Sequence, residues 1–549
     1  MTTFRGPALE TEEGIGALTL PAFLEEVTHR YAKREAVAFR NSVHWTYEDL
    51  WREARRVAKA LIAAGIQRGA RVALLMGNRP EWVASAYGAT MAGAVLVPLN
   101  TYLEPPELDH VLSHSDAAFV LMQRSLLRHQ YLDELLELCP ELERGSLSTR
   151  FPFLRGAFCI DLDSRRGAVE PWEDFLRGGD TVPDEIVDAA AAQVTPADDA
   201  LIIYTSGTTA KPKGVLHAHR AAALQAWRYV RHLRLDEDIR SWTAFPFFWS
   251  AGFAMGMGGT LAAGGCLVLQ EYFEPGEALG LFESERVTTP HAWPHQIAQL
   301  VDHPDWESRD LSSLRHVDPG TTLARHKTVH VDKDWSPRSA YGVTETFTFI
   351  TSLPADTDPE IRERCQGRIL PGNVVRILHP ETGEALPPGE IGEIATKGLT
   401  LMKGYWKVPP ERTFDEDGFY RTGDAGWVDP DGTFHWTGRT TDMIKTGGAN
   451  VSPVEIETEL LRHPGLKTSV AVGVPHETLG EMVVLCAVPH ERAEIDEENV
   501  RAFLRGRLAS YKIPRRVLFF REDELSLTGN QKIRTEELRA LASARLAAE

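Results

Sequence analysis

Long apolar runs are absent from this sequence of 549 residues: no uninterrupted stretch approaches the ~18 residues of a membrane-spanning helix. Cysteine is also scarce, and its five positions are scattered without Cys-x-x-Cys spacing. This pattern argues against a zinc site and against a disulfide framework. The N-terminus lacks a basic-then-apolar signal pattern, and the C-terminus carries no peroxisomal or retention tag. We therefore expect a cytoplasmic protein without an integral membrane segment.

Positively charged residues are also few relative to negatively charged ones. The formal net charge is −19, which argues against broad binding to nucleic acid or to anionic membranes. The chain has 13 lysines against 46 arginines, yet four lysines lie in stretches rich in glycine and threonine: Lys211, Lys213, Lys445 and Lys532. If the chain binds small polyanions, positive charge must be concentrated locally, and these four lysines are the candidates.

What is present is the composition of a globular protein, with 43% apolar and 25% charged residues. A chain of this length is expected to form two or more domains. Helical and strand-like segments alternate over the first 200 residues, as in Tyr47 to Ala64, Arg71 to Met76 and Glu81 to Met91. That alternation predicts a layered α/β domain with a parallel sheet. Short β-like runs over residues 366–436 predict a small β-barrel.

The stretch from Tyr204 to Gly214 is the most informative. It follows a short apolar run and precedes an alanine-rich segment, His217 to Leu233, that reads as a helix. A hydroxyl-rich turn between a strand and a helix gathers N–H groups and side-chain donors around a small anion. It is not a Walker A loop, because Pro212 separates its two lysines. A polar surface turn is the alternative, but the ordered combination favours phosphate binding. The predicted phosphate-binding residues are Thr205, Ser206, Gly207, Thr208, Thr209 and Lys213.

This stretch resembles the signature phosphate loop of the adenylate-forming enzymes, the family of acyl-CoA synthetases, luciferases and peptide-synthetase adenylation domains. Five motifs stand in the family order over nearly the whole chain, so the sequence is identified as a member, closest to bacterial acyl-CoA ligases. The resemblance implies an α/β fold whose large N-terminal domain, residues 1–438, has two α/β subdomains and a β-barrel. A small mobile α/β C-terminal domain, residues 439–549, would follow.

Residues 341–346 are similar to the family motif around the metal. A single glutamate in an otherwise uncharged turn can hold Mg²⁺ through its carboxylate, so Glu345 is the predicted metal ligand and one of the predicted catalytic residues. The resemblance implies that Thr344 donates to the α-phosphate and that Tyr341 stacks on adenine. The alternative for residues 341–346 is a capped turn with no role in binding. Gly320 is assigned to the adenine-flanking strand by spacing alone.

Residues 418–424 resemble the ribose-binding motif of the family. A carboxylate accepts two hydroxyl hydrogen bonds at once, so Asp424 suits a vicinal diol. Arg439 would contact the ribose or a phosphate. Lys532 matches the lysine of the family's C-terminal loop, where an ammonium can bridge the attacking carboxylate and the α-phosphate. A solvated surface lysine is the alternative for Lys532.

Residues 438–448 read as a domain boundary. In the family, the C-terminal domain rotates about this linker between two reactions. Thr441 stands at the hinge, where aspartate or lysine is usual. Gly447 and Gly448 would line the tunnel for the pantetheine of CoA, because a Cβ there would obstruct the thiol. Lys445 is assigned to the same CoA-binding segment.

An aromatic cluster follows the phosphate stretch. The predicted acyl pocket consists of Phe247, Phe248, Trp249 and Trp293. Core packing is the alternative, and it would be favoured about two to one if the cluster stood alone. Trp249 replaces the usual histidine of the family and fills space. No acidic residue stands where amino-acid-activating relatives place an aspartate, so an α-amino acid substrate is disfavoured.

The implied reaction uses ATP, Mg²⁺ and CoA to convert a carboxylic acid to its CoA thioester through an acyl-adenylate, and a bulky apolar acid is expected. Three alternatives stay open. Ala210, the segment from Asp318 to Gly320 and Thr441 point to a member poor at adenylation that uses preformed acyl-adenylate. A non-catalytic nucleotide-binding or scaffold protein could keep the fold, and a carrier protein could replace CoA. A homodimer is also considered.

Overall fold

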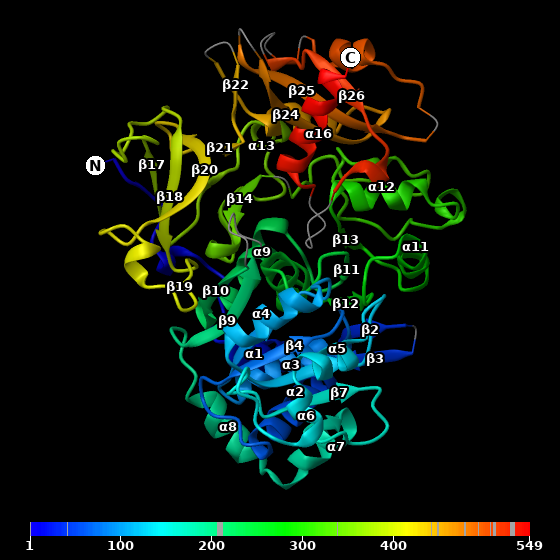
Figure 1. Cartoon of the computed structure of the whole chain (residues 1–549), viewed down its shortest axis with the longest axis vertical. Helices are drawn as coiled ribbons and strands as arrows, with labels where there is room; N and C mark the ends of the chain where they lie inside the picture. The colour runs from blue at the N-terminus through cyan, green and yellow to red at the C-terminus, as the bar shows by residue number, and fades with distance from the viewer. Residues whose placement is uncertain are drawn as a thin grey trace.

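The computed structural model describes residues 2–40, 42–205, 212–337, 339–440, 442–446, 449–476, 479–491, 493–505, 507–508, 512–526 and 533–548. The expected division into a large N-terminal α/β domain and a small C-terminal domain is confirmed (Figure 1). The C-terminal strands and α16 (Thr535–Ala547) lie at one end of the long axis, and the helices of residues 140–192 lie at the other. Within the described ranges, no helix has both the length and the apolar character needed to cross a bilayer.

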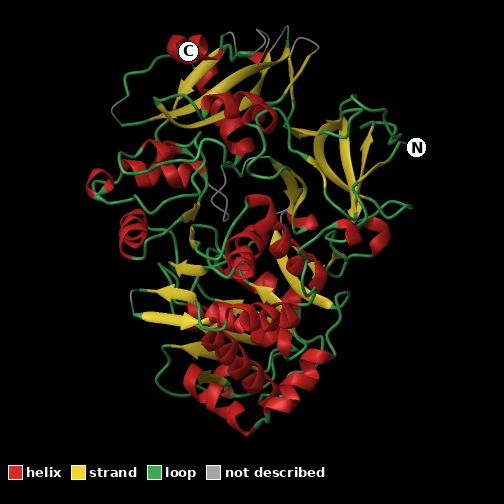
Figure 2. Ribbon diagram, turned by 180° about the vertical axis from the view of Figure 1, so that it is seen from behind, coloured by secondary structure: helices red, strands yellow, loops and turns green. Residues whose placement is uncertain are grey.

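The first subdomain is an eight-stranded sheet. Its core strands are parallel and read as continuous apolar runs, as in Arg71–Leu75, because both faces are covered by helices (Figure 2). Two antiparallel strands, β10 and β19, complete one edge. The order is β19 (Gly404–Tyr405), β10 (Lys213–Ala218), β9 (Asp199–Thr205), β5 (Val95–Pro98), β4 (Arg71–Leu75), β6 (Ala117–Gln123), β7 (Gly156–Ile160) and β8 (Val169–Pro171).

Helices of the first half pack on this sheet and on one another. Helix α2 begins at a capping box in which Thr46 and Asp49 bind each other's main-chain N–H. Helix α3 is buried on almost every side, with only Glu81 half-buried, because it lies in the core shared by both subdomains. The helices are α1 (Leu20–Tyr31), α2 (Tyr47–Ala63), α3 (Pro80–Met91), α4 (Pro105–Ser115), α5 (Tyr131–Leu138), α6 (Pro140–Arg144), α7 (Trp172–Gly178) and α8 (Asp184–Ala192).

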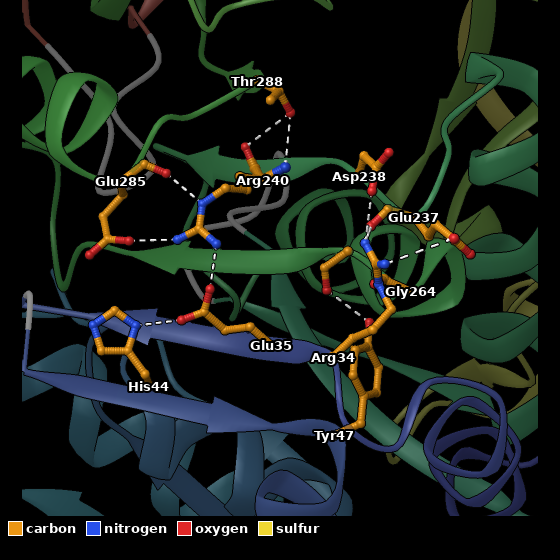
Figure 3. A network of polar contacts seen from close by, with 11 residues as sticks. Arg34, Glu35, His44, Tyr47, Glu237, Asp238, Arg240, Gly264, Glu285 and Thr288 are labelled. Atoms are coloured by element: carbon orange, nitrogen blue, oxygen red, sulfur yellow. Dashed lines mark hydrogen bonds and ion pairs between the residues drawn. The ribbon is translucent and has the colours of Figure 1, made fainter.

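The second subdomain is a five-stranded sheet that takes two strands from the N-terminus. Its order is β13 (Thr289–His291), β11 (Arg240–Thr243), β12 (Cys266–Leu269), β2 (Glu35–Phe39) and β3 (Val43–Thr46), with helices α9 (His219–Leu233), α10 (Gly259–Ala263), α11 (Pro275–Ser284) and α12 (Pro294–Asp302). Arg240 joins its distant parts, since its guanidinium binds the carboxylates of Glu35 and Glu285 (Figure 3). Burial acts to raise the pKa of Glu35, but its contacts with Arg240 and His44 hold that pKa below its usual value.

A five-stranded half-barrel stands where the barrel was expected. Its order is β1 (Phe4–Arg5), β17 (Asn373–Leu378), β18 (Gly392–Gly398), β20 (Tyr420–Val428) and β21 (Phe434–Arg439). A smaller sheet beside it contains β14 (Ala340–Val343), β15 (Thr348–Ser352) and β16 (Arg368–Ile369), followed along the chain from β15 by α13 (Pro359–Arg362). The half-barrel therefore includes strands from both the start and the end of the large domain.

The C-terminal domain is a sheet covered on both faces. The long antiparallel pair β24 and β25 alternates its side chains between two separate apolar clusters, so Ala471 packs in one and Val472 in the other. The elements are β22 (Ile444–Thr446), β23 (Ala449–Val451), α14 (Pro453–Leu460), β24 (Leu466–His476), β25 (Gly480–Pro489), α15 (Glu497–Leu504), β26 (Arg516–Phe519) and α16 (Thr535–Ala547). The predicted domain boundary falls at the end of β21.

One local prediction was wrong, and one segment differs from the family pattern with which it was aligned. The segment from His217 to Leu233 is not one helix: α9 starts at His219, and His217 belongs to β10. Its pairing with β9 and β19 overrides the helical preference suggested by the alanines. Residues 317–322 form a turn rather than a strand, because the Asp318 side chain accepts the Gly320 N–H at 2.9 Å.

Candidate functional site

The predicted phosphate stretch connects two antiparallel strands. β9 ends at Thr205 and β10 begins at Lys213, and these two residues stand opposite each other in the register. Both side chains are half-buried at the base of the connection. The remaining predicted phosphate-binding residues, Ser206, Gly207, Thr208 and Thr209, lie outside the described residues.

Glu345 lies in a single helical turn, Thr344–Thr346, between β14 and β15. The hydroxyl of Thr346 fastens this turn, since it accepts the Val343 N–H at 3.0 Å and lies 3.0 Å from the Val343 carbonyl. The Glu345 carbonyl accepts the Met402 N–H at 2.7 Å, which ties the turn to the segment before β19. The Glu345 side chain therefore extends from a main chain that hydrogen bonds hold on two sides.

Tyr405 connects Glu345 to the phosphate stretch. Its hydroxyl donates to Glu345 Oε1 at 2.7 Å and lies 2.9 Å from the hydroxyl of Tyr420. The Lys213 ammonium lies over the Tyr405 ring, 5.2 Å from its centroid. A cation and a carboxylate from distant parts of the sequence therefore meet on one tyrosine.

Asp424 is the centre of a second cluster. It is 4% exposed, and its Oδ2 accepts the Tyr341 hydroxyl at 2.7 Å, while Arg439 Nε lies 3.3 Å from Oδ1. Burial raises the pKa of Asp424, and Arg439 and Tyr341 oppose that rise. Strand β20 joins the two clusters, because it carries both Asp424 and Tyr420, whose hydroxyl lies 2.9 Å from that of Tyr405. The Glu345 charge also raises the pKa of Asp424. The lone pairs left on the fixed carboxylate can accept the two hydroxyls of a ribose.

Tyr341 has two roles in this cluster. One of its ring faces packs on Phe434 at 5.1 Å between centroids, and its hydroxyl holds Asp424. Burial, reinforced by the Asp424 charge, raises the Tyr341 pKa well above its usual value, so the phenol stays protonated and donates. Its predicted stacking on adenine stays a prediction.

The predicted acyl-pocket residues fall into two groups: residues buried in the core and residues that keep accessible surface. Phe247 is 0% exposed and belongs to the main core. Phe248 is buried against Trp249, whose own side chain is half-buried, and the half-buried Trp293 packs on Phe245 at 4.8 Å between centroids. Trp249 and Trp293 keep accessible surface, so they are the ones that can contact a ligand without a rearrangement.

The aromatic segment leads into an unusual helix. Gly252–Gly258 is π-helical, a conformation that occurs often at functional sites. A Cβ on Gly252 would come within 2.1 Å of the Pro246 carbonyl oxygen. Only glycine therefore allows the chain to fold back so closely after the aromatic residues.

Gly320 lines a groove between the two domains. The groove, with a volume of ≈ 60 Å³, also includes Ile297 of α12 and Leu466 of β24. Beside it, Asp302 of the large domain binds two groups of the C-terminal domain, Lys467 Nζ at 2.8 Å and His490 Nδ1 at 3.3 Å. The predicted adenine-flanking residue therefore lies next to the contact between the domains.

The predicted residues of the C-terminal half are placed only in part. Lys445 lies in β22, but its side chain is outside the described part of the chain. Thr441, Gly447, Gly448 and Lys532 also lie outside the described residues.

The site residues fit Mg²⁺ as part of a nucleotide complex. Among the residues described, no group of three or more His, Cys, Asp or Glu side chains could form a metal cage. Mg²⁺ is usually held by one or two carboxylates together with substrate phosphates and water. Glu345, fixed by Tyr405 beside the phosphate stretch, supplies such a carboxylate.

Sequence reasoning missed Tyr405 and Tyr420. Tyr405 stands in no predicted motif, and Tyr420 lies within the predicted ribose motif, residues 418–424, where no role was assigned to it. Nothing in their spacing links them to Glu345. Their importance becomes visible only when β19 pairs with β10 and the half-barrel brings β20 alongside.

Comparison with known proteins agrees with this geometry. The sequence model of the AMP-binding enzyme family matches residues 24–406, and that of the AMP-binding enzyme C-terminal domain matches residues 455–532. A feruloyl-CoA synthase of Amycolatopsis is 35% identical over 90% of this chain and 93% of its own length. An indoleacetate–CoA ligase of Aromatoleum aromaticum is 31% identical over 91% and 93%. The crystal structure of the anthranilate CoA ligase AuaEII with anthranoyl-AMP has a TM-score of 0.77 at 25% identity, covering 96% and 98% of the two chains.

The chain belongs to the AMP-binding enzyme family. The resemblance to adenylate-forming enzymes is thereby confirmed, as is the expected class, an acid–thiol ligase of the AMP-forming type.

Proposed function

We propose that this chain activates a bulky apolar carboxylic acid with ATP, through an acyl-adenylate, and transfers the acyl group to CoA. One observation carries the proposal: Lys213 and Glu345 meet on Tyr405 next to the diol-binding candidate Asp424. A nucleotide needs a cation for phosphate, a carboxylate for its metal and an acceptor for its ribose, and this cluster supplies all three.

In the first step, a carboxylate oxygen of the acid attacks the α-phosphorus of ATP. The new P–O bond forms as the bond to the bridging oxygen breaks, giving acyl-AMP and pyrophosphate. Lys213 and Lys532 would offset the charge on the phosphates, and Asp424 would hold the ribose. Mg²⁺ held by Glu345 would neutralise phosphate oxygens. Positioning and charge stabilisation carry this reaction, so no nucleophilic side chain is needed.

In the second step, the thiol of CoA attacks the acyl carbon of the mixed anhydride. The C–S bond forms, the C–O bond to AMP breaks, and the thiol proton passes to solvent. Gly447 and Gly448 would line the route of the thiol. Rotation of the C-terminal domain about Thr441 would bring this segment to the acyl-adenylate.

The size of the acid is inferred from the aromatic wall. Trp249 and Trp293 are large and partly accessible, and Phe248 is packed behind Trp249. The names of the two relatives describe ligases for feruloyl and indoleacetate groups, both aromatic, which supports the same size class. Aromatic, polycyclic and medium-to-long-chain acids are the substrates to test.

A thioester assay over a panel of acids tests the proposal. Aromatic and polycyclic acids should give kcat/KM values well above those of acetate and of amino acids. Trp249→Ala should shift the preference toward larger acids, whereas a conservative substitution in the core, Phe247→Leu, should leave the ranking unchanged. Preference of the wild-type enzyme for acetate or amino acids would refute the size argument.

One observation favours a second candidate, a member poor at adenylation. The turn at Asp318–Thr321 replaces the strand expected beside adenine. Such a protein would form the thioester from supplied acyl-AMP but exchange pyrophosphate poorly. Robust exchange of pyrophosphate into ATP that depends on the acid would exclude it.

A further inference from the structure

Tyr405 is fixed in place by its backbone. It belongs to the two-residue strand β19, where it stands opposite Val215 of β10. The next residue, Trp406, donates its N–H to the Gly214 carbonyl at 2.7 Å, so the pairing continues toward the phosphate stretch. The main chain at Tyr405 therefore cannot move away from β10 without breaking this pairing.

The hydroxyl groups around Tyr405 form a directed chain. The Tyr405 hydroxyl donates to Glu345, so the hydrogen bond of 2.9 Å between the two tyrosines has Tyr420 as the donor. The carboxylate therefore receives a hydrogen bond that is itself polarised by a second one.

The ring of Tyr405 serves the opposite charge. Lys213 stands over its face, at the first residue of β10. The Tyr405 hydroxyl, at the ring edge, thus contacts a carboxylate while the ring face contacts an ammonium. A phenylalanine would keep the face and lose the edge contact, and a leucine would lose both.

We propose that Tyr405 is a positioning residue that fixes the Glu345 carboxylate relative to Lys213, with Tyr420 as its support. This inference rests on the proposed function, because Glu345 is there the metal ligand. Its consequence is specific: loss of the Tyr405 hydroxyl weakens metal binding, whereas loss of the ring also weakens binding of the nucleotide phosphates.

The test compares Tyr405→Phe, Tyr405→Leu and Tyr420→Phe with a matched control, Tyr47→Phe. Tyr47, labelled in Figure 3, is fully buried, whereas Tyr405 is half-buried. The Tyr47 hydroxyl donates at 2.8 Å to the Gly265 carbonyl in the second subdomain. Mn²⁺ affinity of the enzyme–ATP complex is read from the Mn²⁺ EPR signal. Affinity for ATP is measured separately by calorimetry, and thermal midpoints report folding.

Tyr405→Phe should weaken Mn²⁺ binding about tenfold, the effect of one charge-assisted hydrogen bond, with little change in ATP affinity. Tyr420→Phe should have a smaller effect on the metal. Tyr405→Leu should also weaken ATP binding several-fold. Tyr47→Phe should change neither affinity, although its thermal midpoint can fall as far as that of Tyr405→Phe.

Unchanged Mn²⁺ affinity in Tyr405→Phe would overturn the inference, and so would an equal loss in Tyr47→Phe. Pyrophosphate exchange by the wild type separates this failure from a failure of the proposed function. Robust exchange with unaltered Mn²⁺ binding in the variant refutes the role of Tyr405 alone. A wild type that neither exchanges pyrophosphate nor binds Mn²⁺ with ATP refutes both.

Discussion

Glu457 of α14 makes the stability of the C-terminal domain depend on pH. Burial raises its pKa to about 7 and the Asp442 carboxylate adds to the rise, although the Ala471 N–H donates to Oε1 at 2.9 Å. The folded state therefore holds this proton more tightly than the unfolded chain, whose pKa is about 4.5. Below pH ~4.5 Glu457 is protonated in both states, and it does not lower the free energy of unfolding. From there to pH ~7 the folded state loses stability progressively, and above pH 7 the loss is complete.

The magnitude follows from that interval. It spans roughly 2.5 pH units, and at ~1.36 kcal/mol each the upper bound is about 3.4 kcal/mol. Because Glu457 keeps some exposure, solvent screening reduces the effect to about 2 kcal/mol. Glu457→Gln removes the charge and keeps an oxygen for the Ala471 N–H. We expect this substitution to stabilise the domain by about 2 kcal/mol at pH 8 and by nearly nothing at pH 4.5.

Hydrogen exchange by mass spectrometry on peptides from β24 and β25 measures this gain. Tryptophan fluorescence cannot, because the last of the 13 tryptophans is Trp436, in the half-barrel. Glu455→Gln is the matched control on the same helix: it loses an ion pair of 2.6 Å with Lys512 and should show no gain at high pH. An equal gain from Glu457→Gln at pH 4.5 and pH 8, or no gain at either, would refute the reasoning.

Three further predictions concern the site and the contact between the domains. Tyr341→Phe removes the hydroxyl that holds Asp424, the proposed ribose ligand, so KM for ATP in pyrophosphate exchange should rise about fivefold with KM for the acid unchanged. Asp302→Asn weakens the contact shared by Lys467 and His490, and limited proteolysis near residue 440 should become several-fold faster while the large domain melts as before. Lys532→Ala should cripple adenylation and spare thioester formation from supplied acyl-AMP; equal loss in both half-reactions would contradict its assigned role.

The fold class was predictable because it depends on patterns that are local in sequence. The apolar run of Arg71–Leu75 and the capped helix after Thr46 are found where the alternation placed them. His217 was misassigned because strand formation there depends on pairing with β9 and β19, which no local pattern records.

The candidate site was predictable only in part, for the same physical reason. Glu345, Asp424 and Lys213 stand in stretches whose order along the chain suggested nucleotide chemistry. Tyr405 and Tyr420 meet Glu345 through hydrogen bonds between separate strands, so these contacts could not be predicted before the sheets were known, although Tyr420 lies in the predicted ribose motif. Phe247 looked like its neighbours in sequence, but burial places it in the core.

Strand β19 has a consequence for how the protein can be cut and recombined. The chain leaves the half-barrel after β18, completes an edge of the eight-stranded sheet as β19, and returns to the half-barrel as β20. Neither unit is complete without the other, so the half-barrel is not a module that can be exchanged alone. In a chimera with a breakpoint between β18 and β20, Tyr405 would come from a different parent protein than either Glu345 or Tyr420. The natural place to exchange parts between relatives lies after β21, where the C-terminal domain can be replaced as a whole.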